Sequence, residues 1–70
     1  MSAETAAIRA ALAKLEPGAG VSFQCPGGQP FNRDFYLRIN SVAYGLWGPG
    51  KYRMKSAHKE IGVIRRRAEP

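Results

Sequence analysis

The sequence contains few of the residues with which small domains cross-link their folds and build catalytic centres. Among its 70 residues there is one cysteine, Cys25, and one histidine, His58. A lone cysteine excludes an internal disulfide and a cysteine-based zinc site, and it favours a reducing, cytoplasmic environment. No apolar run approaches the roughly 18 residues of a membrane span. Residues 1–15 lack the basic flank and cleavage site of a secretory signal, so we expect neither membrane association nor secretion.

These shortages also argue against an enzyme. Cys25 is expected to be a small buried hydrophobe rather than a nucleophile, because the only histidine that could serve as its base is His58. That histidine has no acidic residue to orient it except Glu60. The glycines at 27–28 and 48–50 lack the pattern of a phosphate-binding loop. We therefore predict a protein without catalytic residues, metal or other cofactor, or small-molecule substrate.

Positive charge is concentrated in the second half of the chain. Residues 1–32 are neutral, whereas residues 33–67 contain nine Lys and Arg against Asp34 and Glu60, a formal charge of +7. Such an asymmetry indicates one electropositive face directed at a polyanion. The alternative is that these charges are spread over solvated strands and serve solubility.

The hydrophobic pattern predicts a single small α+β domain over residues 1–67, with a frayed tail at 68–70. Its first element is a helix over residues 3–16, rich in alanine and ended by Pro17. The apolar stripe of this helix consists of Ile8, Ala11, Leu12 and Leu15. Residues 21–25 follow as a short half-buried strand, because apolar and polar residues alternate there.

Residues 31–48 fit both a strand pattern and a helix pattern. As a helix, the segment has one apolar face, which consists of Phe35, Ile39, Val42, Ala43 and Leu46. Length favours the helix, since a strand usually spans about 4–8 residues. We expect Asn32 or Asp34 to cap the start of this helix, and the Gly-Pro-Gly run at 48–50 to end it.

After residue 50 the period of the pattern changes to two. In the strand expected over residues 51–55, apolar side chains alternate with lysine and arginine, which gives an apolar side and a basic side. A polar loop is expected over residues 56–60 and a returning strand over 61–64, with Gly62 as a candidate bulge. The predicted order is helix, strand, helix, strand, strand.

The second helix and the hairpin together predict a surface for duplex DNA. Arginine and asparagine match guanine and adenine edges in the major groove, and serine and tyrosine bond phosphate oxygens. Lysines and arginines of the hairpin, and the arginine triplet after it, suit a phosphate backbone. The predicted contact residues on the helix are Arg33, Arg38, Asn40, Ser41 and Tyr44. Those on the hairpin and after it are Lys51, Arg53, Lys55, His58, Lys59, Arg65, Arg66 and Arg67.

Four segments carry a resemblance to known proteins, namely AGVSF at 19–23, LRINSVA at 37–43, KYRM at 51–54 and IGVIRR at 61–66. They resemble segments of small basic proteins encoded by tailed bacteriophages, and the order of elements resembles a reduced winged helix-turn-helix domain. The resemblance implies a winged-helix-like fold in which the C-terminal hairpin, residues 51–59, is the wing. By the same resemblance the residues with a recognition role are Arg33, Asn40, Ser41 and Tyr44. The chain departs from a full winged domain because residues 26–31 leave no room for the helix that precedes the recognition helix.

Two functions are compatible with these features. The first is a non-enzymatic DNA-binding regulator of transcription, encoded by a phage and acting in the host cytoplasm. The alternative is a phage-encoded inhibitor that covers an acidic surface of a host enzyme, such as RNA polymerase or a nuclease complex, during host takeover. In that case the same charges steer protein association. The anchors would then be Leu37, Tyr44 and Trp47, although Trp47 borders the apolar stripe and is expected in the core.

Overall fold

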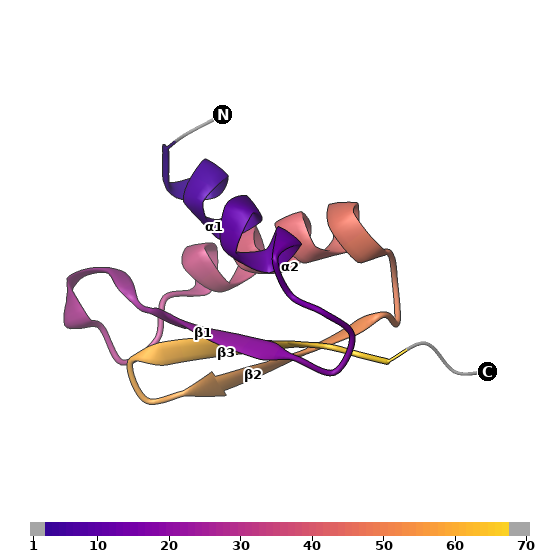
Figure 1. Cartoon of the computed structure of the whole chain (residues 1–70). Coiled ribbons are helices and arrows are strands. Elements are labelled where there is room, and N and C mark those ends of the chain that lie inside the picture. The colour runs from indigo at the N-terminus through magenta and orange to yellow at the C-terminus, as the bar shows by residue number, and fades with distance from the viewer. Residues whose placement is uncertain (1–2, 68–70) are drawn as a thin grey trace.

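The computed structural model describes residues 3–67, which form two helices and a three-stranded antiparallel sheet (Figure 1). In chain order the elements are α1 (Ala3–Ala13), β1 (Gly20–Gln24), the 3-10 turn η1 (Pro26–Gly28), α2 (Arg33–Trp47), β2 (Tyr52–Ala57) and β3 (Glu60–Arg65). The α+β class and the predicted order of helices and strands are therefore confirmed. The predicted tail at 68–70 lies outside the described residues. No helix within residues 3–67 is long and apolar enough to cross a membrane.

The two helices pack on the same face of the sheet and leave its other face open (Figure 1). The strand order is β1-β3-β2, so β1 and β2 are both edge strands. The uncovered side of the sheet is termed the open face. The residues of this face form three rows across the strands, which are Gly20, Ile64 and Arg53, then Ser22, Gly62 and Lys55, then Gln24, Glu60 and Ala57.

The hydrophobic core lies between the helices and the sheet. Its buried members are Ile8, Leu12, Cys25, Phe35, Ile39, Val42, Ala43, Ile61 and Val63. The predicted apolar faces of both helices thus point inward, with Leu15, Leu46 and Trp47 packed at the rim. Cys25 is 5% exposed, which confirms its expected place as a small buried hydrophobe.

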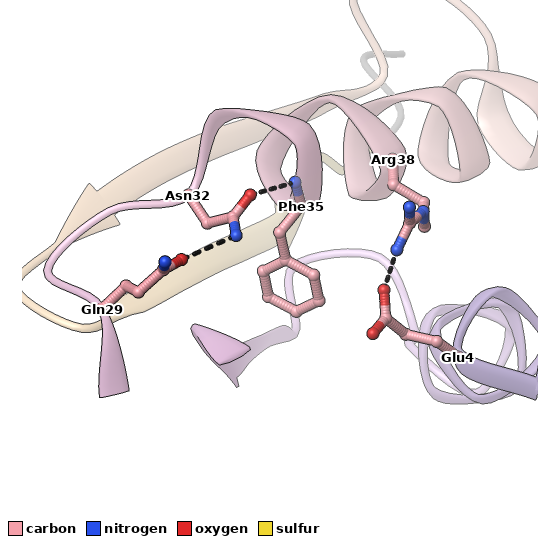
Figure 2. Close-up of polar contacts among 5 residues, drawn as sticks. All are labelled: Glu4, Gln29, Asn32, Phe35 and Arg38. Atoms are coloured by element: carbon pink, nitrogen blue, oxygen red, sulfur yellow. Dashed lines mark hydrogen bonds and ion pairs between the residues drawn. The ribbon is translucent and has the colours of Figure 1, made fainter. Parts of the chain in front are cut away.

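Helix α2 begins at one of its two predicted caps. The side-chain Oδ1 of Asn32 accepts a hydrogen bond from the Phe35 amide over 2.9 Å, and its Nδ2 donates to Oε1 of Gln29 over 2.8 Å (Figure 2). The first bond satisfies an amide that has no partner within the helix. At the other end Gly48 has φ of 89°, and its amide donates to the Tyr44 carbonyl. Glycine is favoured there because a side chain would strain this conformation.

The predicted end of the first helix is wrong by three residues. Helix α1 ends at Ala13 rather than at residue 16. The Leu15 amide bonds back to the Leu12 carbonyl over 3.0 Å, so the chain tightens into a turn. The helical conformation is also unfavourable for a residue that precedes a proline, and Pro17 follows this turn.

The predicted polar loop at 56–60 is also wrong, because both strands of the hairpin are longer than expected. Ser56 and Ala57 belong to β2 and pair with Ile61 and Glu60, which leaves a turn of only His58 and Lys59. Polar or small residues continue the strand here because backbone pairing does not require an apolar side chain. Gly62 does not mark a bulge, since it pairs in regular register with Ser22 and Lys55.

The end of the hairpin is anchored to the loop that follows β1. Lys59 has φ of 66°, an uncommon value for a residue with a side chain. Its amide donates to the Pro30 carbonyl over 3.0 Å, and its carbonyl accepts from the Cys25 amide over 2.8 Å. These two bonds hold the turn in its left-handed conformation and fix the hairpin relative to the rest of the domain.

Candidate nucleic-acid interface

The basic side of the hairpin lies on the open face of the sheet. Tyr52 and Met54 point toward the helices and pack against the core. The residues that alternate with them along the strand therefore point to the opposite side of the sheet. Arg53 and Lys55 are exposed on the open face, opposite Ile64 and Gly62 of β3. Beyond the end of the strands the Arg66 amide donates to the carbonyl of Lys51 over 3.0 Å. These four cations are termed the basic strip, which consists of Arg53 and Lys55 on the open face and of Lys51 and Arg66 at the border between this face and the end of α2.

The middle of the open face is shallow because its residues are small. Gly20, Ser22 and Gly62 line a depression of about 280 Å³ that is bordered by Lys55 and Ile64. A neighbouring depression of about 360 Å³ is lined by Arg53, Lys55 and Ile64 together with Met54. The side chain of Ile64 is 45% exposed. The surface therefore offers cations beside a flat, partly apolar floor.

The charge of this surface is not neutralised by the part of the chain that the structure describes. Within residues 3–67 the structure contains one ion pair, between Arg38 and Glu4, and it lies in the helical layer (Figure 2). The single acidic residue of the hairpin is Glu60, whose Oε2 accepts a hydrogen bond of 3.5 Å from Gln24 at the turn end. None of the cations of the basic strip is thus paired with an acidic side chain of residues 3–67.

A third depression lies where the sheet meets the end of α2. It measures about 270 Å³, and its lining consists of Pro17, Leu46, Trp47, Lys51, Arg65 and Arg66. The guanidinium of Arg65 lies 5.5 Å from the centre of the Trp47 ring and donates to the Leu15 carbonyl over 2.8 Å. Arg66 donates to the carbonyl of Gly50 over 3.4 Å. Two arginines of the predicted triplet are therefore held in place, and the third, Arg67, is exposed.

The predicted recognition residues of α2 divide into two groups. Arg38 is paired with Glu4 of α1, and Asn40 accepts a hydrogen bond from the Tyr52 hydroxyl over 2.6 Å. Arg33, Ser41 and Tyr44 are exposed. Two of the five side chains are thus engaged in contacts within the domain.

The helix and the hairpin of the predicted DNA surface belong to different layers of the fold. Helix α2 lies against one face of the sheet (Figure 1), whereas Arg53 and Lys55 are exposed on the other face. His58 and Lys59 are exposed at the end of the hairpin. The structure therefore brings the hairpin cations together but separates them from Arg33, Ser41 and Tyr44.

Burial raises the pKa of Tyr52 above its usual value, and the nearby phenols of Tyr36 and Tyr44 raise it further. The proton stays on the hydroxyl that binds Asn40. Among residues 3–67 no three metal-ligating side chains are grouped together. The thiol of Cys25 belongs to the core, whereas His58 is exposed on the turn.

The sequence interpretation missed the floor of the open face. The sequence predicts Ile64 as part of a returning strand and Gly62 as a candidate bulge, and it assigns neither to a surface. The alternation of Ile61 and Val63 with these two residues carries the missing signal, because it assigns them to the side away from the core. Compared with known proteins, the chain matches no family model, and neither a curated protein nor a solved structure is significantly similar to it.

Proposed function

We propose that this protein is a non-enzymatic nucleic-acid-binding regulator that holds duplex DNA against the open face of its sheet. The observation that carries the proposal is the basic strip. Its Arg53 and Lys55 are exposed on the open face, its Lys51 and Arg66 are exposed beyond the end of the strands, and none of the four has an acidic partner in the described part of the chain. Phosphate groups are the natural counterions for such a surface, because each contact releases condensed cations from the duplex.

The flat floor beside the strip supports the same proposal. Gly20, Ser22 and Gly62 leave room for a backbone to approach the strands closely, and Ser22 offers a hydroxyl donor. The side chain of Ile64 supplies apolar contact to sugars or base edges. This arrangement suits contacts to the phosphate and sugar, which position a duplex without reading its sequence.

A winged-helix-like arrangement is the finer form of this proposal. In that arrangement α2 is the recognition helix, the hairpin is the wing, and η1 stands where a full winged domain has another helix. The exposed residues Arg33, Ser41 and Tyr44 would make the base contacts. Because α2 lies on the side of the sheet opposite the open face, we propose that the open face makes the main phosphate contacts and that α2 contributes sequence preference separately.

One observation favours the alternative, a phage-encoded inhibitor of a host enzyme. Leu37 and Tyr44 of α2 are 47% and 56% exposed, and together they give the helix a partly apolar outer surface. Large side chains of this kind anchor protein interfaces. Trp47 is less suited to this role, because it packs at the core rim against Tyr52 and Arg65.

The test is the salt dependence of duplex binding, measured by fluorescence anisotropy with a labelled oligonucleotide. We expect the affinity of the wild-type protein to fall steeply with salt. The double variant Arg53→Ala/Lys55→Ala should weaken binding to all sequences alike and lower the slope of log affinity against log salt by about 2. The matched control is Arg9→Ala/Lys14→Ala, which removes the same charge from α1 and the turn after it and should leave the slope near its wild-type value.

Three outcomes would change the proposal. Equal effects of the two double variants would mean that only net charge matters and that the open face is not the interface. A stronger effect of Arg33→Ala and Tyr44→Ala than of the hairpin variant would transfer the interface to α2. Binding that is absent, or insensitive to salt, would reject nucleic acid as the target and favour the inhibitor.

A further inference from the structure

The two edges of the sheet differ in the charge that prevents one chain from pairing with another. Strand β1, with the sequence GVSFQ, has no charged residue, no proline and no bulge. Strand β2 carries Arg53 and Lys55. Charged side chains, prolines and bulges are the usual means by which proteins block an exposed edge. Within the described part of the chain, β1 is therefore the unprotected edge.

The backbone groups of β1 that point outward can be identified from the ladder with β3. The Arg65 amide donates to the Ala19 carbonyl, and the Cys25 amide donates to the Lys59 carbonyl. In an antiparallel strand the amide and carbonyl of one residue point to the same side, and alternate residues point to opposite sides. The residues that point away from β3 are therefore Gly20, Ser22 and Gln24, all of which are exposed.

We propose that β1 is a homodimer interface, at which it pairs antiparallel with β1 of a second copy of this chain. The pairing centres on Ser22, which faces Ser22 of the second copy, so that Gly20 faces Gln24. Each of these pairs exchanges two backbone hydrogen bonds. The contact is the same on both copies and closes on a two-fold axis. On the helix side Val21 faces Phe23 of the second copy, and both half-buried side chains gain apolar contact.

Charge excludes the other edge from this role. Two β2 strands pairing around Met54 would set Arg53 opposite Lys55 of the second copy, and like charges directly across a pair of strands are destabilising. Pairing of β1 with β2 would not close on itself and would continue into an open filament. The pairing of β1 with β1 of a second copy avoids the charge repulsion and also closes on itself.

The dimer would have one continuous six-stranded sheet with both open faces on the same side. The two β2 strands would form its outer edges, separated by five strand spacings, or about 24 Å. The basic strips would lie along these edges, with the neutral floor between them. This inference rests on the backbone of β1 and does not depend on the nature of the ligand.

The first experiment is disulfide trapping with a single introduced cysteine. In the proposed register the two Cα atoms at position 22 are about 5.5 Å apart, a separation that a disulfide can span. Ser22→Cys should therefore give a covalent dimer on mild oxidation. The matched control is Ser56→Cys, at an exposed position of the β2 edge. This variant and the wild-type protein, whose Cys25 is buried, should stay monomeric on a non-reducing gel.

The second experiment measures the mass in solution by sedimentation equilibrium over a range of concentrations. Wild-type protein and Ser22→Ala should reach twice the monomer mass. Ser22→Pro should remain monomeric and folded, because it deletes an amide that does not bond β3. Ser22→Lys, which sets two like charges face to face, should also remain monomeric and serves if the proline variant does not fold.

Wild-type protein that is monomeric at every concentration would overturn the inference. So would a folded Ser22→Lys variant that still dimerises, or trapping of Ser56→Cys as readily as Ser22→Cys. A monomer that binds duplex DNA with the expected salt dependence would reject the dimer but leave the proposed function intact. A dimer without affinity for DNA would support the inferred dimer and reject the proposed function.

Discussion

The hydroxyl of Tyr52 donates a hydrogen bond to Oδ1 of Asn40 over 2.6 Å and so ties the first strand of the hairpin to helix α2. The same hydroxyl lies 3.3 Å from the Asn40 carbonyl oxygen. From sequence, Asn40 is a candidate for reading adenine edges. In the folded protein its side-chain oxygen is used to join two elements instead.

We predict that Tyr52→Phe lowers the free energy of unfolding by about 1 kcal/mol, because it leaves the half-buried oxygen of Asn40 without this donor. Asn40→Ala should destabilise the domain similarly and leave its preference among DNA sequences unchanged. Urea denaturation measures the first effect, and binding to a panel of duplexes measures the second. An Asn40→Ala protein of normal stability but altered sequence preference would contradict this assignment.

The raised pKa of Tyr52 predicts a loss of stability at alkaline pH. The folded state holds the phenolic proton more tightly than the unfolded chain, whose tyrosines titrate near pH 10. The tighter binding of this proton contributes to the free energy of unfolding. That contribution is fully present below pH 10 and is lost as the pH rises through the higher pKa of the folded state. The stability difference between wild type and Tyr52→Phe should therefore shrink on going from pH 9 to pH 11. A difference that stays constant would show that the hydroxyl does not titrate in this range.

The ion pair between Arg38 and Glu4 joins the two helices at the surface, where its two side chains are 43% and 44% exposed (Figure 2). We predict that Glu4→Gln lowers the free energy of unfolding by less than about 1 kcal/mol and that this loss of stability disappears in concentrated salt. Thermal denaturation at low and high salt measures it. Glu16→Gln removes the same charge without breaking a described ion pair and is the control. Equal losses from both variants would attribute the effect to net charge.

The glycines of the open face differ in the space around them. A Cβ atom added at Gly62 would come no closer than 3.6 Å to any neighbour, whereas one at Gly20 would lie 3.1 Å from Cγ1 of Ile64 and 3.2 Å from the Val63 carbonyl oxygen. Glycine within a strand is less stable than alanine by roughly 0.5–1 kcal/mol. We therefore expect Gly62→Ala to stabilise the domain by about this amount, and Gly20→Ala to gain less or nothing. Chemical denaturation of both variants would show it, and a loss at Gly62 would contradict the geometry.

Local patterns predicted the elements of this fold well. The 3.6-residue period of Phe35, Ile39 and Val42 and the two-residue period around Tyr52 and Met54 depend only on neighbours in the chain, and both patterns hold in the structure. These patterns also indicated that the hairpin has a basic side.

The contacts of individual site residues were not predictable in the same way. Arg38 meets Glu4 across 34 positions of the chain, and Asn40 meets Tyr52 across 12. No periodicity reports such pairs, because they arise only when the elements pack. The exposure of Ile64 was not predicted for another reason. A branched apolar residue in a strand is more often buried than exposed.

Because the helices cover only one side of the sheet, the amino acids that form the core of this protein and those of the proposed DNA-binding surface occupy alternate positions of the same strands. Selection can therefore act on them separately. Positions 53, 55, 62 and 64 are open to substitution while the inward positions between them stay unchanged. A lineage carrying this scaffold is free to acquire new targets without rebuilding its interior.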